Sequence, residues 1–536
     1  MNTRTFRQTT ALLVLVAWAG SAAAQKAPGH PKLDNALNAV ADAFKQGGPN
    51  AATAEARTKG LDTRPNGLIA VVVEPASGDG SSIDADDVAA HGARLDAVSR
   101  SFARVLVAPG QLASLAGDPE ISLVRVATPA VELGGFGAKV SESVALTGAD
   151  AAQAAGFNGA GAKVAVVDLG FIGLAAKIAA GELPASTVSV DYSGTGIEAG
   201  TSHGVGVAEH VMDMAPAAQL YCVKVGDEVD LQNAADLLVQ AGIQIANHSV
   251  GWVIASYYDN TGPINAIIND SYANDGKFWA VAAGNDAKRH WRATSWIDTD
   301  NDKWFEFSGK IELMDLTTSS SVSYVFLNWD QYGNSLTDLD LYVVDKRGKT
   351  VASSVGAQTG TQEPSEALAF TYIPARAPFK IKIKRYAGPT TGLDMTVFSF
   401  YNDLKYAVAA NSLMDPANAS GAFSVAAINQ ANWNGSMVPE PYSSRGPTND
   451  GRQQPQITAP DGTTSLTYGT RASFGTSFSS PTTAGAAAIL LSEDSLRTAQ
   501  QLTQLLRNSA IDIGAAGWDA TYGHGKLRVL TGQPNP

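Results

Sequence analysis

The chain has 536 residues, 45% of them hydrophobic, and carries a net charge of −13 with a pI of about 5.0. This length predicts two to four structural units, each with enough apolar residues to bury a sizeable core. An acidic chain without a long run of Lys or Arg lacks the basic patch that nucleic-acid binding requires, so nucleic-acid partners are excluded.

The first 24 residues are typical of a secretory signal peptide. Arg4 and Arg7 supply the positive start, an apolar run follows over 11–18, and small residues lie just before Gln25. The apolar run is too short to cross a bilayer, and no second run of spanning length follows. We therefore expect a protein that is exported to the periplasm or the medium, with no membrane partner.

A small α+β unit is predicted between the signal peptide and about residue 128. Strand-like runs at 67–73, 103–107 and 121–127 alternate with helix-like stretches at 33–44, 84–99 and 111–116. A unit of this size folds alone only marginally.

From residue 161 the chain alternates between buried strands and amphipathic helices. The strands are expected at 163–168, 219–225, 244–249 and 277–282, and the helices at 205–214, 231–241 and 264–274. Continuous apolar strands alternating with helices predict an α/β fold with a doubly wound parallel sheet. Cys222, the only cysteine, lies in one of these strands, where a small core residue is a better interpretation than a reactive thiol.

Residues 292–405 interrupt this pattern with short strands of two-residue periodicity. They are expected at 310–314, 322–327, 339–344, 368–372, 379–384 and 395–400, which predicts an inserted antiparallel β-sandwich. Asp338, Asp340 and Tyr342 share one strand face. That face is either simply solvated or a structural Ca²⁺ site, and no other metal or cofactor is expected.

Four polar residues occupy positions where α/β proteins place working groups. Asp168 and Asn285 end predicted parallel strands, and functional groups of open α/β sheets gather beyond those ends. His203 opens a helical stretch. Ser477 precedes a small-residue run suited to a buried helix, whose N-terminus favours developing negative charge, with Pro481 expected in its first turn.

Each of these residues has a plainer interpretation when it is taken alone. A strand-end Asp or Gly-Asn makes a turn, a His at a helix start is solvated or caps the helix, and Ser477 serves as an N-cap. Two other motif assignments fail. Gly159-Ala-Gly161 precedes its strand and lacks a third glycine, and Ser479 stands where the nucleophile elbow of α/β-hydrolases has Gly.

Taken together, the order Asp168, His203, Asn285, Ser477 resembles that of the subtilisin-like serine proteases, or subtilases. The resemblance covers roughly residues 140–290 and 406–530. Its supporting segments lie at 214–225, 247–251, 443–448 and 522–527.

This resemblance implies a serine endopeptidase. Ser477 would be the nucleophile, His203 the general base and then the general acid, and Asp168 the group that holds the imidazole. Asn285 and the Ser477 backbone N–H would form the oxyanion hole.

The resemblance also implies how partners bind. Ser249, Val250 and Gly251 would form an edge strand that pairs with a protein or peptide substrate. Trp252 beside them either shapes a specificity pocket or simply packs. The α+β unit would be an inhibitory propeptide, the chain's own partner, removed by self-cleavage between about residues 131 and 141.

Three positions depart from the family pattern. Leu169 stands where Ser or Thr usually follows the Asp, the usual His-Gly-Thr-His becomes His203-Gly-Val-Gly206, and Asp461 replaces a Gly. These departures surround the four residues without replacing them, and they keep a weakened or inactive enzyme among the alternatives.

The expected organisation is a signal peptide over 1–24, a propeptide over 25–135 with its module at about 66–128, and a catalytic domain over 140–291 and 406–530. The β-sandwich over 292–405 divides the catalytic domain. Two rival functions remain: a non-catalytic binding protein on this scaffold, and another α/β hydrolase such as an esterase.

Overall fold

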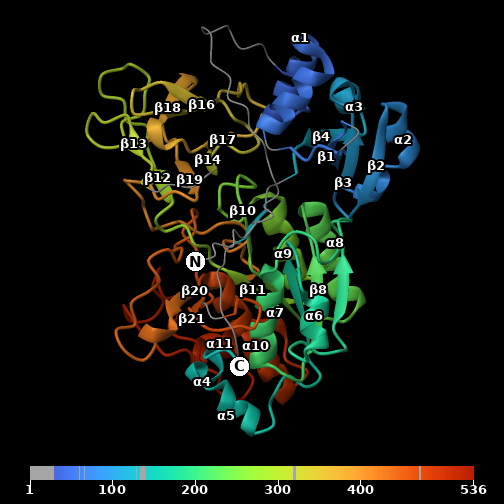
Figure 1. Cartoon of the computed structure of the whole chain (residues 1–536), viewed down its shortest axis with the longest axis vertical. Coiled ribbons are helices and arrows are strands. Elements are labelled where there is room, and N and C mark those ends of the chain that lie inside the picture. The colour runs from blue at the N-terminus through green and yellow to red at the C-terminus, as the bar shows by residue number, and fades with distance from the viewer. Residues whose placement is uncertain are drawn as a thin grey trace, which may run out of the picture.

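A computed structural model describes residues 29–59, 61–64, 67–127, 130–132, 140–317, 322–469 and 472–536. The expected signal peptide lies outside these ranges. Figure 1 shows an α/β part at the bottom of the view, with the amino-terminal unit and the β-sandwich side by side above it. In the part of the chain so described, no helix has the length and apolar character needed to span a membrane.

The α/β part is built on a seven-stranded sheet in the order β21-β20-β11-β9-β6-β8-β7. All six neighbouring pairs are parallel, which confirms the predicted doubly wound sheet. The strands are β6 (Lys163–Asp168), β7 (Val188–Asp191), β8 (Gln219–Lys224), β9 (Ile245–His248), β11 (Phe278–Ala282), β20 (Ala422–Asn429) and β21 (Ile457–Asp461).

Helices cover both faces of this sheet. They are α4 (Ser143–Thr147), α5 (Ala149–Ala154), α6 (Leu174–Ala179), α7 (His203–Met214), α8 (Glu228–Gln240), α9 (Gly262–Ala273), α10 (Thr476–Glu493) and α11 (Ala499–Ser509). Val164 and Val166 pack in the core that contains α7 and α10, whereas Ala165 and Val167 pack in the core that contains α8 and α9. Burial on both faces is why the strands are continuous apolar runs.

The amino-terminal unit has a four-stranded sheet in the order β2-β3-β1-β4. Its strands are β1 (Ile69–Pro75), β2 (Ala93–Val98), β3 (Ala103–Val107) and β4 (Ile121–Arg125), and its helices are α1 (Asn35–Thr58), α2 (Ala85–Ala90) and α3 (Leu112–Ala116). The prediction of helix over 84–99 is wrong in its second half. Gly92, with a φ of 69°, follows the end of α2, and the chain then pairs with β3 as a strand.

The inserted part is a sandwich of two antiparallel four-stranded sheets, ordered β12-β19-β14-β17 and β13-β18-β15-β16. Its strands are β12 (His290–Ala293), β13 (Met314–Asp315), β14 (Val322–Trp329), β15 (Asp338–Val344), β16 (Thr350–Ser354), β17 (Ser365–Thr371), β18 (Lys380–Ala387) and β19 (Met395–Phe400). Strands β12 and β16 were not predicted. The solvated-face interpretation is also wrong, because Asp338 and Asp340 are only 4% and 3% exposed.

A separate two-stranded ribbon joins the amino-terminal unit to the α/β part. Strand β5 (Ala130–Glu132) pairs antiparallel with β10 (Val250–Trp252), with Val131 opposite Gly251. Short 3-10 turns complete the fold: η1 (Gly80–Ser82), η2 (Pro109–Gln111), η3 (Pro374–Arg376) and η4 (Gln430–Asn432).

Candidate active site

The fold brings Asp168 and His203 into direct contact. Asp168 is the last residue of β6 and His203 the first of α7, and the His203 Nδ1 donates a hydrogen bond of 2.8 Å to the Asp168 Oδ2. The Asp168 and His203 side chains are 0% and 2% exposed. A carboxylate on Nδ1 fixes the imidazole so that Nε2 is the nitrogen left for proton transfer.

Ser477 is the second residue of α10 and lies beside this pair. The His203 ring packs edge-on against Phe478, the next residue of the helix, with ring centroids 5.8 Å apart. The Ser477 hydroxyl donates to the Ser249 carbonyl oxygen at 3.2 Å. The predicted nucleophile and the predicted substrate strand therefore meet at one point.

Pro481 accounts for a second contact between these segments. It lies in the second turn of α10, not the first as predicted, because the helix already begins at Thr476. A proline has no N–H to donate to the carbonyl four residues earlier. That carbonyl belongs to Ser477, and it accepts a hydrogen bond of 3.0 Å from the Ser249 hydroxyl instead.

Asn285 is tied to the same helix start. Its Oδ1 accepts hydrogen bonds from the Thr476 N–H at 3.0 Å and from the Thr476 hydroxyl at 3.1 Å. The Thr476 hydroxyl oxygen accepts from the Gly284 N–H at 3.2 Å. With its oxygen held in this way, the Asn285 carboxamide presents its NH₂ group, the donor that an oxyanion requires.

His248 links strands β6 and β10 next to the site, and it was not predicted as a functional residue. Its Nδ1 donates to the Val167 carbonyl at 2.9 Å, and its Nε2 accepts from the Trp252 indole N–H at 3.0 Å. Burial lowers the pKa of His248 to about 4, so the ring stays neutral. Trp252 is fully buried in this contact, which favours packing over a pocket-lining role.

Asp461 is a second residue whose contacts the sequence did not predict. Its Oδ2 accepts hydrogen bonds from the Gly475 N–H at 2.8 Å and from the Tyr442 hydroxyl. Gly475 is the N-cap of α10 and has a φ of 122°, a backbone conformation that favours glycine. The carboxyl that replaces the usual Gly thus holds the turn immediately before Ser477.

The other two departures also have physical reasons. A Cβ atom at Gly206 would lie 2.5 Å from the Tyr468 ring, so this helix has no room for a second His. Leu169 donates its backbone N–H to the Asp168 Oδ1 at 2.8 Å. This bond supplies a donor to the carboxylate without a hydroxyl side chain.

Acidic side chains that could hold a cation lie elsewhere than expected. Within the described ranges, Asp298, Asp300 and Asp302 place carboxylate oxygens within 4.8 Å of one another, on a partly exposed loop of the sandwich. In β15, Tyr342 donates its hydroxyl to the Asp340 Oδ2 at 3.1 Å. The carboxylates of Asp338 and Asp340 are therefore part of a buried polar cluster.

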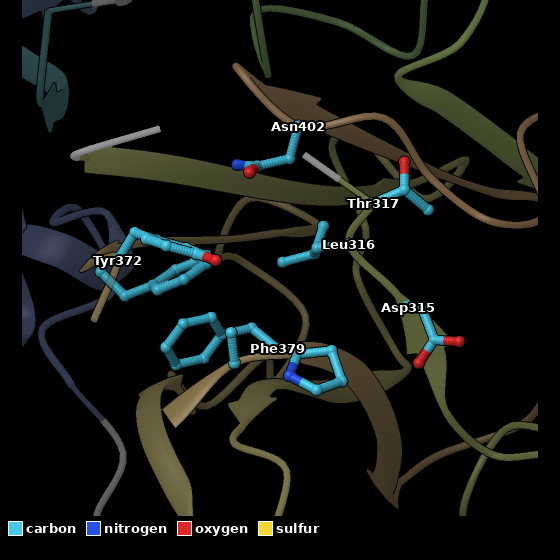
Figure 2. A pocket seen from close by; sticks show the side chains of 9 residues that line it. Asp315, Leu316, Thr317, Tyr372, Phe379 and Asn402 are labelled. Atoms are coloured by element: carbon cyan, nitrogen blue, oxygen red, sulfur yellow. The ribbon is translucent and has the colours of Figure 1, made fainter. Parts of the chain in front are cut away.

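The sandwich also carries a cavity of about 620 Å³. Figure 2 shows the Tyr372 and Phe379 rings on one side of it and Asp315, Thr317 and Asn402 on the other. None of the residues that line this cavity belongs to the predicted site.

A family profile and two solved structures match parts of this chain. The profile of the subtilase family matches residues 332–525, a range that includes Ser477 and begins inside the sandwich. The structure of the Clostridium perfringens CspB protease matches with a TM-score of 0.52 and 14% identity, over 72% of this chain and 97% of that one.

A lanthipeptide protease matches with a TM-score of 0.39 and 16% identity, over 74% of this chain and 97% of that one, which is too weak to bear on the fold. No curated protein matches.

Proposed function

We propose that this protein is an exported serine endopeptidase that cleaves proteins through an acyl-enzyme on Ser477. The observation that carries the proposal is the Asp168–His203 hydrogen bond beside the start of α10. His203 takes the Ser477 proton as the hydroxyl oxygen attacks the peptide carbonyl carbon. The resulting oxyanion accepts from the Asn285 NH₂ and the Ser477 N–H. The C–N bond then breaks, the amine leaves with the proton from His203, and water releases the acyl group.

We further infer that the chain is a zymogen whose pro-segment, residues 25–135, occupies its own substrate strand. The pairing of β5 with β10 supports this, because extended substrates add a strand to such an edge. Residue 131 lies opposite Gly251 and residue 132 opposite Val250. Ser249, the residue before β10, accepts a hydrogen bond from the Ser477 hydroxyl through its carbonyl oxygen, so this ribbon lies next to Ser477. We therefore expect self-cleavage between about residues 131 and 141.

The rival functions make different demands on the site. A non-catalytic binding protein has no need of a buried carboxylate–imidazole pair next to a serine, so this contact favours catalysis. An esterase has no need of an extended backbone-pairing strand, so β10 favours a peptide substrate.

Mass spectrometry of the secreted protein, wild type beside Ser477→Ala, tests the proposal. We expect the wild type to begin between about residues 131 and 141, to react with a fluorophosphonate and to hydrolyse casein, and the variant to do none of these. Ser479→Ala is a matched control: this serine lies two residues further along α10, bonds to the Ala459 and Pro460 carbonyls, and should leave labelling intact. Fluorophosphonate labelling that persists in Ser477→Ala would overturn the assignment.

A further inference from the structure

The amino-terminal unit contacts the inserted sandwich as well as the α/β part. Asn35, the first residue of α1, donates its side-chain Nδ2 to the Glu363 carbonyl oxygen at 3.5 Å. A Cβ atom at Gly356 would lie 3.1 Å from the Asn35 Cβ, a tight contact, so the two segments lie close together there. Figure 1 shows α1 beside the β16 and β17 side of the sandwich. The sandwich loop over 355–364, between these strands, therefore lies against the start of α1.

Arg125, at the end of β4, joins the amino-terminal unit to the α/β part. Its Nε donates to Glu74 of the amino-terminal unit at 2.7 Å, and its Nη1 donates to Glu228, in the first turn of α8. Glu363 of the sandwich lies near enough for its carboxyl group to interact electrostatically with Arg125. Burial and the charges of Asp34 and Glu74 raise the pKa of Glu363 to about 7, although the Arg125 charge acts in the opposite direction. The charge of one guanidinium thus acts on carboxyl groups of three separate units.

The end of the amino-terminal unit that faces the sandwich is itself firmly built. The Asp34 carboxylate caps α1 through the Leu37 N–H and also accepts from the Val126 N–H. Leu33 forms a parallel bridge with Val124 of β4. The start of α1, which carries Asn35, is therefore bonded directly to β4 and to the residue that follows Arg125.

We propose that the 355–364 loop of the inserted sandwich is a second docking surface for the pro-segment. The pro-segment is then released only when its contacts with both the α/β part and the sandwich are broken. This inference rests on the proposed zymogen function. Two surfaces that hold one rigid body act together, because the second contact forms at a high effective concentration once the first is made. Weak contacts at Asn35 therefore slow release of the pro-segment much more than they would alone.

The test places the change in the pro-segment, so that the mature enzyme stays chemically identical. Asn35→Trp puts a large side chain against Gly356, while Ala54→Trp is a matched control at an exposed position of the same helix. The measurements are the rate of pro-segment loss after cleavage and the lag before casein hydrolysis. Because overpacking weakens the contact with the loop, we expect the pro-segment to be released about tenfold faster from Asn35→Trp and at the wild-type rate from Ala54→Trp. Equal release rates in the two variants would overturn the proposal.

A second measurement separates this proposal from the proposed function. In the uncleaved Ser477→Ala chain, Gly356→Val should increase hydrogen exchange of the α1 and β4 amides about tenfold, whereas Thr350→Val, at an exposed position of β16, should not. Unchanged exchange in Gly356→Val contradicts the docking surface. If the wild type shows no processing but Gly356→Val raises the exchange rate, the zymogen function fails and the docking surface stands.

Discussion

At the scale of single residues, the carboxyl of Asp461 is the unusual feature next to Ser477, the proposed nucleophile. Burial and the neighbouring Glu440 together raise its pKa to about 7. Its hydrogen bonds to the Gly475 N–H and the Tyr442 hydroxyl hold the turn that precedes α10. A buried acid in this position makes the stability of the nucleophile turn depend on pH.

Asp461→Asn should flatten that dependence while retaining an acceptor for the Gly475 N–H. Because the folded-state pKa of Asp461 is raised, its favourable contribution to folding is complete below about pH 4 and is lost as the pH rises towards 7. Thermal unfolding of Ser477→Ala chains with and without Asp461→Asn should therefore diverge over this range. The difference should reach at most about 1.4 kcal/mol per pH unit. If the stabilities of the two proteins changed with pH in the same way, Asp461 would not titrate between pH 4 and 7.

At the scale of elements, the first turn of α8 concentrates negative charge that the amino-terminal unit neutralises. Asp227 caps the helix through the Val229 and Asp230 N–H groups, an arrangement that suits the positive end of a helix. Arg104 of β3 pairs with Asp227 at 2.7 Å and with Asp230 at 3.0 Å. The two units are therefore joined by ion pairs at α8 and by strand pairing at β10.

Arg104→Ala should weaken that docking much more than Arg94→Ala. The Arg104 side chain is 7% exposed, whereas Arg94, on the neighbouring strand β2, is 66% exposed and serves as the control. Removal of one partner of a buried ion pair leaves uncompensated charge and costs about 3–5 kcal/mol. Denaturant unfolding of Ser477→Ala chains at pH 8, above the raised pKa of about 7 of Asp230, measures the loss. Equal losses in the two variants would contradict the role of the Arg104 pairs.

At the scale of the whole molecule, an apolar cluster joins the sandwich to the α/β part. Val253, Tyr258 and Met414 come from the α/β part, and Phe326, Phe398 and Phe400 come from the sandwich. Val253 directly follows β10, the proposed substrate strand, and the Tyr258 and Phe398 rings meet edge-on with centroids 5.1 Å apart. This cluster packs the inserted domain against the segment that follows β10.

Phe398→Ala should lower the free energy of unfolding by about 3–5 kcal/mol, because it opens a cavity in a fully buried cluster. It should also reduce casein hydrolysis as the sandwich shifts against β10. Tyr401→Ala, at a 55% exposed position of the sandwich, is the control and should change neither quantity. A full-strength Phe398→Ala enzyme with normal stability would show that the sandwich is only loosely attached.

The sequence alone was enough to predict the parallel sheet, the inserted sandwich and the ordered positions of Asp168, His203, Asn285 and Ser477. Strand and helix periodicity is local, so a stretch such as 163–168 reveals its burial on both faces without its neighbours. The helix predicted over 84–99 was wrong in its second half, because pairing with β3 overrides helix propensity there.

Only the tertiary structure decided the contacts between segments that are distant in the chain. The pairing of β5 with β10, the pairs of Arg104 and Arg125 with α8, and the contact of Asp461 with Gly475 depend on register and orientation across long loops. Residue type does not encode these quantities locally. The sequence therefore determined which side chains are available, and the folded chain determined which segment pairs with β10 and which surfaces contact the amino-terminal unit.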